Sequence, residues 1–447
     1  MTIFNVVDYG AIGDGQTDVS KSFQKAIAAA NEVGGGTVYV PSGVFRTTSI
    51  RLESNITLEV SPGATISFVT EQETYPVVHS RWEGWTQDVY QSCIYAENVE
   101  NIKICGGGVI DGNGADWWDL FRNRREELKY PRPKLISFEK SNRITIQDVQ
   151  LRNSPAWTIN PILSHNITVD NVSILNPADS PNTDGIDPES CSNVRISNCN
   201  IDVGDDCIAI KSGTEDAAEK VACENITITN CTMIHGHGGV VLGSEMSGDI
   251  RNVVISNCIF KQTDRGIRLK TRRGRGGTIE DIRIDNIVMD EVICPFILNL
   301  YYFCGPRGKE KYVWDKNPYP VTEETPTFRR IHFNHITARN VQGAAGFIYG
   351  LAENYIKEIT FNNIDISMAE DAEPGQVAMM TGLDYMNNRG FYVGNGEDIL
   401  FNHVSVENHE GPMIYLENCR NIQTENCVSK NTEQVEKLIE EKVVHFS

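Results

Sequence analysis

The chain has 447 residues, of which 40% are hydrophobic and 22% charged, and its formal net charge is −20 at pH 7. This is the composition of an ordinary soluble protein with a large core, and so negative a charge argues against non-specific binding of nucleic acid or of an anionic membrane. No run of about 18 apolar residues is present, so no segment is predicted to span a membrane. From the charge and the missing apolar run together, we expect neither a nucleic-acid partner nor a membrane partner.

The N-terminal stretch, residues 1–18, has no basic start, no apolar core and no small-residue cleavage site. It predicts no signal peptide, and we expect a cytoplasmic protein, or a secreted one if a leader has been removed. Residues 18–36 then predict a helix that caps the N-terminal end of the fold, with Asp18 or Ser20 at its start and Gly34 at its end. Three apolar side chains make its buried face: Phe23, Ile27 and Ala30.

A short pattern of alternating apolar residues, often followed by Asn or Asp, then recurs along the chain. This alternation is typical of a strand with one buried face. Six apolar anchors lie 23, 27, 32, 27 and 29 residues apart: Ile144, Ile167, Val194, Ile226, Val253 and Ile282. No helix of useful length fits between them, so the pattern predicts an all-β parallel β-helix whose asparagines adopt a left-handed turn.

We expect one domain over residues 1–447, with an N-terminal cap at about 1–50 and a C-terminal cap at about 430–447. A helix is plausible near residue 432. Three stretches break the repeat and hold five tryptophans, so they are expected to form loops that build a binding surface. These stretches are residues 71–95, 113–135 and 301–327.

The twelve cysteines form no CxxC motif, so we expect no zinc site and no other metal site. Several share the same place in the repeat: Cys199, Cys231, Cys258, Cys419 and Cys427. They are either a disulfide set of a secreted protein or buried thiols at equivalent positions, and the missing leader favours buried thiols.

Unusual polar residues gather in four successive repeats. Asp184 and Asp205 are 21 residues apart, Asp206 and His237 are 31 apart, and His237 and Arg268 are 31 apart. At about one coil each, these residues share roughly one phase and are expected to stack on one side. Crowded carboxylates raise one another's pKa, which suits an acid and a base acting across a glycosidic bond. The alternatives are aspartates that cap a turn or bind calcium.

Four motifs in this order resemble those of the family 28 glycoside hydrolases, the polygalacturonases. They are Asn182-Thr183-Asp184, Asp205-Asp206, Gly236-His237-Gly238 and Arg268-Leu269-Lys270, where the family has Ile in place of Leu269. The stretches GIDPESC and GGVVLGSEMSG are similar to bacterial exo-acting members. The resemblance covers nearly the whole chain.

The resemblance implies a right-handed β-helix without cofactor that hydrolyses α-1,4 bonds of pectic oligo- or polygalacturonides with inversion. Asp205 would be the general acid, and Asp184 and Asp206 would hold the attacking water, with carboxyls about 6.5–9.5 Å apart. His237 would tune the acid. Arg268 and Lys270 would bind a substrate carboxylate, and Asn182 and Glu245 are further substrate-binding candidates.

The expected mode of cleavage is at the ends of the sugar chain. Exo action is favoured, and the alternatives are an endo-polygalacturonase, a hydrolase of rhamnogalacturonan or xylogalacturonan, a calcium-dependent pectate lyase and a non-catalytic glycan-binding β-helix.

Seven Lys or Arg between Lys261 and Arg275 can attract the polyanion, although residues 272–275 can equally be a solvated loop. His235 is expected in a turn and Cys207 in the core.

Overall fold

The computed structural model describes residues 2–431 and 438–441. Its contacts divide the chain into two compact units, Met1–Ala209 with Glu224–Cys231, and Ile210–Cys223 with Thr232–Ser447. Each unit consists mainly of short strands paired in parallel, coil on coil.

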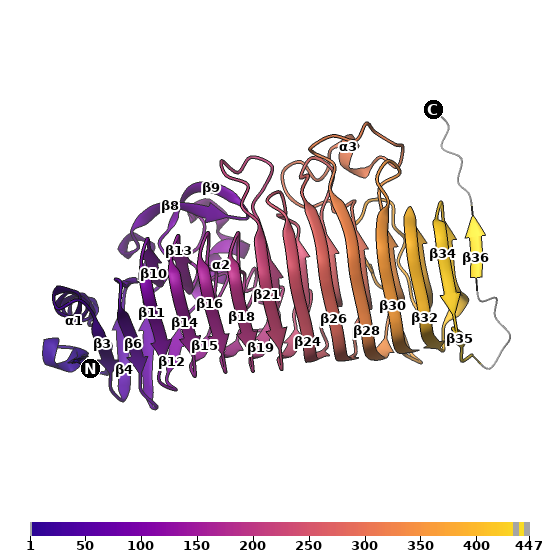
Figure 1. Cartoon of the computed structure of the whole chain (residues 1–447). Helices are drawn as coiled ribbons and strands as arrows, with labels where there is room; N and C mark the ends of the chain where they lie inside the picture. Colours follow the sequence, from indigo (N-terminus) through magenta and orange to yellow (C-terminus); the bar gives the residue numbers. More distant parts are fainter. Residues whose placement is uncertain (1, 432–437, 442–447) are drawn as a thin grey trace. The chain divides into compact units, whose positions relative to one another are not determined.

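Helix α1 (Ser20–Glu32) begins the first unit, where it packs against strand β3 (Gly36–Val40) (Figure 1). Its predicted apolar face is buried, and the Asp18 carboxylate accepts the Ser20 N–H at 2.9 Å. Gly34 follows the helix with φ +87°, in the left-handed region that favours glycine. The N-terminal capping helix is therefore confirmed.

The apolar anchors of the repeat face one another in the parallel sheet of each unit. In the first unit they lie in β14 (Asn142–Gln147), β16 (His165–Asp170), β18 (Ser192–Ser197) and β21 (Cys223–Thr229). Ile144 pairs with Ile167, Ile167 with Val194, and Val194 with Ile226. The second unit repeats this in β24 (Ile250–Lys261) and β26 (Thr278–Asp290). The pairing confirms the predicted parallel β-helix class.

An Asn or Asp with positive φ follows each of the six apolar anchors, as expected, and in β24 and β26 this asparagine lies within the longer strand. Asn198 and Asn230 have φ of 56° and 55°, and the Asn230 amide donates to Asn198 Oδ1 at 3.4 Å. In the second unit the Asn286 amide donates to Asn257 Oδ1 at 2.8 Å. Asn tolerates the left-handed conformation, and its side chain hydrogen-bonds to the same residue one coil away.

A second parallel sheet in the second unit contains β23 (Val240–Gly243), β25 (Arg265–Lys270), β27 (Cys294–Asn299), β29 (Ala344–Tyr349), β31 (Arg389–Gly394) and β33 (Glu410–Glu417). The predicted C-terminal helix is wrong for Leu438–Glu441, which form strand β36 beside β33. Strand pairing satisfies the backbone groups that β33 would otherwise leave open. Residues 432–437 and 442–447, the rest of that prediction, lie outside the described residues.

Two of the predicted loops, residues 71–95 and 113–135, contain regular secondary structure. We call these two segments together the covering module. It contains the antiparallel hairpin β8 (Val77–Trp82) and β9 (Trp85–Tyr90) and the helix α2 (Ala115–Asn123), which the repeat pattern did not predict (Figure 1). Trp117 is fully buried and its ring contacts Tyr75 and Tyr90. Trp82 and Trp118 are also buried, so three of the module's four tryptophans belong to the core.

All twelve cysteines lie in the described residues, and none is joined in a disulfide. Of the five at equivalent repeat positions, Cys199, Cys231 and Cys258 are buried as predicted, whereas Cys419 and Cys427 are only partly buried. In the part of the chain that the structure describes, we find no helix with the length and apolar character that crossing a bilayer requires. The cytoplasmic location remains a prediction.

Candidate active site

Three aspartates converge in the first unit. Ile186 pairs with Ile208, so Asp184 lies opposite Asp206 on the adjacent coil, and Asp205 precedes Asp206. One carboxylate oxygen from each of the three lies within 4.8 Å of those of the other two. Asp184 and Asp206 are only 3% and 1% exposed, whereas Asp205 is half-buried. The predicted acidic cluster thus exists in this unit.

Two glycines allow the coils to approach at this cluster. A Cβ on Gly185 would lie 2.4 Å from the Cys207 carbonyl oxygen, and one on Gly204 would lie 2.3 Å from that of Ser180. The Gly204 N–H also donates to Thr183 Oγ1 at 3.3 Å. The backbone around Asp184 is therefore fixed by contacts that no other residue type permits at the two glycines.

One oxygen from each of the three carboxylates lies within 4.8 Å of the other two. This nearest-oxygen distance is compatible with carboxyl groups about 6.5 Å apart, as in inverting glycosidases, and with the closer groups of retaining ones. Carboxylate oxygens are also the ligands that Ca²⁺ prefers, so the cluster by itself does not distinguish a hydrolase from a calcium-dependent lyase.

Next to the cluster, the sheet of the first unit is covered. The Thr158 N–H donates to the Asp184 carbonyl oxygen at 2.8 Å, so Trp157 lies opposite Asp184 one coil earlier. The Trp157 ring is stacked on Trp82 of the hairpin, with centroids 5.3 Å apart and an interplanar angle of 11°. The Lys134 ammonium lies 5.2 Å from the Trp157 ring and donates to the Arg81 carbonyl at 2.7 Å.

Asn182 is engaged within the protein. Its φ is 54°, in the left-handed region, and its Oδ1 accepts a hydrogen bond of 2.7 Å from Arg132. Arg132 lies between two prolines in a stretch without a repeat pattern, and no local sequence pattern indicates this contact. A direct contact of Asn182 with substrate remains untested.

In the second unit, Arg268 and Lys270 share one face of β25, as predicted. Their charged groups lie 5.6 and 5.3 Å from the centre of the Tyr302 ring. Both side chains are buried, 3% and 7% exposed, and Arg268 also contacts the Met379 sulfur at 3.1 Å. Sequence analysis missed Tyr302, which lies in a stretch that broke the repeat.

Glu245 forms a buried ion pair with Lys211 at 3.3 Å and lies 3.9 Å from Arg275. Burial raises the pKa of Glu245, but the positive charges of Lys211 and Arg275 outweigh this effect and lower the pKa to about 2. The carboxylate is thus held ionised by neighbouring side chains of the protein.

His237 is exposed and lies in the turn before β23. Val241, four residues later, pairs with Arg268, so the expectation that His237 and Arg268 share one phase is wrong. The offset of four residues between His237 and Val241 arises in the turn between β22 (Thr232–His235) and β23. His235 has φ 54°, as expected in a turn, and Cys207 is fully buried, as expected in the core.

The arginines of residues 272–275 are not a solvated loop. Arg272 and Arg273 are at most 1% exposed, and they pair with Glu215 at 2.8 Å and with Glu353 at 2.6 Å. Arg275, also buried, lies 3.2 Å from Glu215. These three charges stabilise the fold and do not form the expected surface patch.

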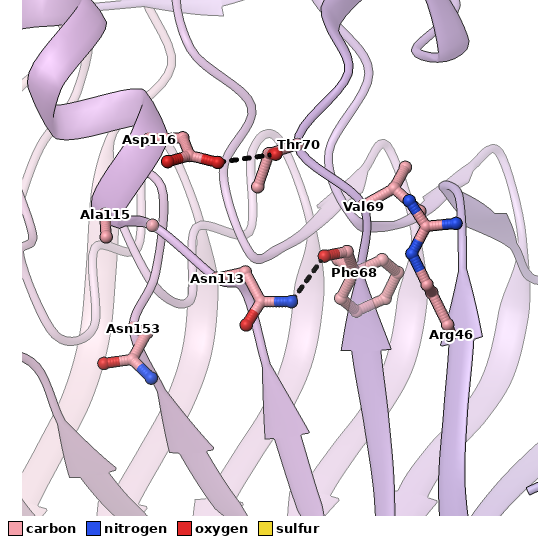
Figure 2. Close-up of a pocket in the computed structure, with 9 residues that line it drawn as sticks. Arg46, Phe68, Val69, Thr70, Asn113, Ala115, Asp116 and Asn153 are labelled. Carbon is pink, nitrogen blue, oxygen red and sulfur yellow. Dashed lines mark hydrogen bonds between the residues drawn. The ribbon is translucent and has the colours of Figure 1, made fainter. Parts of the chain in front are cut away.

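A separate pocket of about 410 Å³ lies in the first unit (Figure 2). Its polar groups bond to one another: Thr70 donates to Asp116 at 2.8 Å, and Asn113 donates to the Phe68 carbonyl at 2.7 Å. Arg46 is paired with Glu71 at 2.8 Å. No predicted site residue lines this pocket.

Comparison with known proteins identifies the family. Residues 32–378 match the model of Glycosyl hydrolases family 28. A probable polygalacturonase of Vitis vinifera is 35% identical over 381 residues, which are 83% of this chain and 75% of that protein. An endo-polygalacturonase of Pectobacterium carotovorum is 31% identical over 58% of this chain and 66% of its own. The exopolygalacturonase structure from Thermotoga maritima has a TM-score of 0.74 and 34% identity, covering 83% of this chain and 88% of its own. The chain therefore belongs to family 28 of the glycosyl hydrolases and is a glycoside hydrolase.

Proposed function

We propose that this hydrolase cleaves α-1,4 bonds between galacturonic acid residues of pectic oligo- and polygalacturonides, at the ends of the chains. The observation that carries the proposal is the cluster of Asp184, Asp205 and Asp206 in a chain of this family. The names of its relatives support galacturonide as the substrate.

The three carboxylates divide an acid role from a base role. Asp205, the half-buried member, gives its proton to the glycosidic oxygen as the bond from that oxygen to C1 breaks. Asp184 and Asp206 lie opposite each other on adjacent coils, so they can hold one water between them and accept its proton as its oxygen bonds to C1. Attack from the side opposite the leaving group inverts the anomeric centre.

Arg268 and Lys270 bind the carboxylate of the substrate. Their charged groups both lie beside the Tyr302 ring, so two cations can bind one carboxylate. His237, exposed in its turn, is proposed to tune the protonation of the acid. The buried pair of Glu245 with Lys211 supports a role in holding the surrounding turns rather than a contact with sugar.

Exo action is favoured by the covered sheet next to Asp184. A sugar chain that lay along the sheet past Asp184 would meet Trp157 and its stacked neighbour Trp82. Similarity to an endo-polygalacturonase supports the alternative of internal cleavage, in which the hairpin moves aside.

Product analysis on oligogalacturonides of defined length tests the proposal. Hydrolysis should release one short product from the first time points, without added calcium. A calcium-dependent product that absorbs ultraviolet light would indicate a lyase, and binding without turnover would indicate a glycan-binding protein.

A further inference from the structure

Arg132 reaches from the covering module to the backbone that carries the acidic cluster. Its Nη1 donates to the carbonyl oxygens of Pro155 and Pro181, each at 2.9 Å, and its Nη2 donates to Asn182 Oδ1 at 2.7 Å. The side chain is 1% exposed. One guanidinium therefore joins two successive coils of the first unit.

These bonds act on the turn that precedes Asp184. Asn182 adopts the left-handed conformation at φ 54°, which Asn tolerates, and its side chain is held by Arg132. Arg132 donates a hydrogen bond to Asn182 in this turn, and the Gly204 N–H donates one to Thr183 Oγ1 in the same turn. A planar guanidinium with several donors fits this task, and a lysine ammonium does not provide the same fork.

Arg132 is in turn held by helix α2. The carbon at the centre of its guanidinium lies 4.1 Å from the centre of the Phe121 ring, and that of Arg125 lies 4.7 Å from the same ring. Arg125 is exposed, and its guanidinium contacts the Phe121 ring rather than the turn before Asp184. Both arginines thus contact the Phe121 ring, and Arg132 in addition hydrogen-bonds to the turn before Asp184.

Burial lowers the pKa of Arg132 to about 10, with Arg125 and Arg122 acting in the same direction and Glu83 and Asp184 acting against it. Since about 10 is well above neutral pH, the guanidinium stays charged at pH 7. It therefore supplies a fixed positive charge that interacts with Asp184.

We infer that Arg132 is a positioning residue for the hydrolytic reaction: it holds the Asn182 turn so that Asp184 meets Asp206 and Asp205 in the productive arrangement. This inference rests on the proposed function and adds a residue that lies outside the four motifs. It also gives the covering module a role in catalysis besides covering the sheet.

The test compares Arg132→Gln, Arg132→Lys and the control Arg125→Gln on trigalacturonate. Misplacement of a catalytic group by about 1 Å can cost about 100-fold, so Arg132→Gln should lower kcat by roughly 30- to 100-fold with KM changed by less than about threefold. Loss of the cation should also move the acidic limb of the pH profile to higher pH. Arg132→Lys should restore the limb but only part of kcat, and Arg125→Gln should match wild type.

A kcat of Arg132→Gln within about threefold of wild type would overturn the inference, as would equal losses in Arg132→Gln and Arg125→Gln. If Arg132→Gln does not fold, Asn182→Ala replaces it, because it removes the acceptor and should reproduce the loss of kcat. An unchanged kcat in Asn182→Ala then overturns the inference. Wild-type enzyme without activity on any galacturonide would instead refute the proposed function.

Discussion

Trp157 lies opposite Asp184 on the preceding coil, and Trp82 of the β8–β9 hairpin is stacked on its ring at 5.3 Å. The position next to a proposed catalytic carboxylate on the preceding coil is thus occupied by an aromatic pair that belongs to the core. This arrangement links the mode of cleavage to a stretch that interrupts the β-helix.

Trigalacturonate should yield free galacturonate and the dimer from the first time points, and the viscosity of the polymer should fall slowly relative to the release of reducing ends. Trp82→Ala should increase internal cleavage, because it removes the cover of Trp157. The substitution also costs about 3–5 kcal/mol of stability, so the assay belongs well below its unfolding temperature. Trp314→Ala, at a tryptophan that is 40% exposed, is the control. A rapid fall in viscosity with wild type would show endo action.

Asp205→Asn should remove turnover while folding and substrate binding survive. An amide cannot donate the proton that the leaving oxygen needs, and loss of a general acid typically costs about 10²–10⁴-fold in rate. The measurement is kcat on trigalacturonate together with a binding titration. More than about a tenth of the wild-type rate would exclude Asp205 as the acid.

Early product should be the β-anomer if Asp184 and Asp206 deliver a water to an α-linked sugar. Proton NMR within the first minutes, before mutarotation, distinguishes the anomers. This measurement matters here because nearest carboxylate oxygens within 4.8 Å of one another are compatible with either stereochemical outcome. Initial α-anomer would mean retention and would assign a nucleophile to the cluster.

Lys270→Met should lower kcat/KM on free-acid oligomers by roughly ten- to several-thousand-fold, because stranding a buried charged partner costs about 2–5 kcal/mol. Methyl-esterified substrate should show a loss of the same order with wild type. The two losses should not add, since each removes one side of the same pair. Equal rates of wild type on esterified and free-acid oligomers would exclude the carboxylate contact.

Glu245 should make the stability of the second unit depend on acid pH. The pKa of Glu245 falls from an ordinary 4.5 to about 2 in the folded protein, so its stabilisation is complete above 4.5 and is lost as pH falls toward 2. Glu245→Gln should lower Tm at pH 7 and flatten the dependence of Tm on pH across this window. Glu53→Gln, at an exposed weak pair, is the control. Parallel curves for wild type and Glu245→Gln would contradict the assignment.

The sequence by itself determined the local features of this protein. Alternating apolar anchors such as Ile144 and Ile167 fixed the strands, because burying one face of a strand requires a period of two. Asparagines such as Asn198 marked the left-handed turns. The spacing of Asp184 and Asp205 by about one coil was enough to predict that their carboxylates would lie close together.

Contacts between distant segments were decided only by the tertiary structure. Arg132 and Asn182 are 50 residues apart, and Trp82 and Trp157 are 75 apart, and in each pair the first residue lies in a stretch without a repeat. Whether Arg273 was solvated or buried depended on Glu353, 80 residues away. A local pattern records which face of a strand is buried, but a charge or an aromatic ring takes its role from whichever partner the fold brings to it, and that partner leaves no mark in the neighbouring sequence.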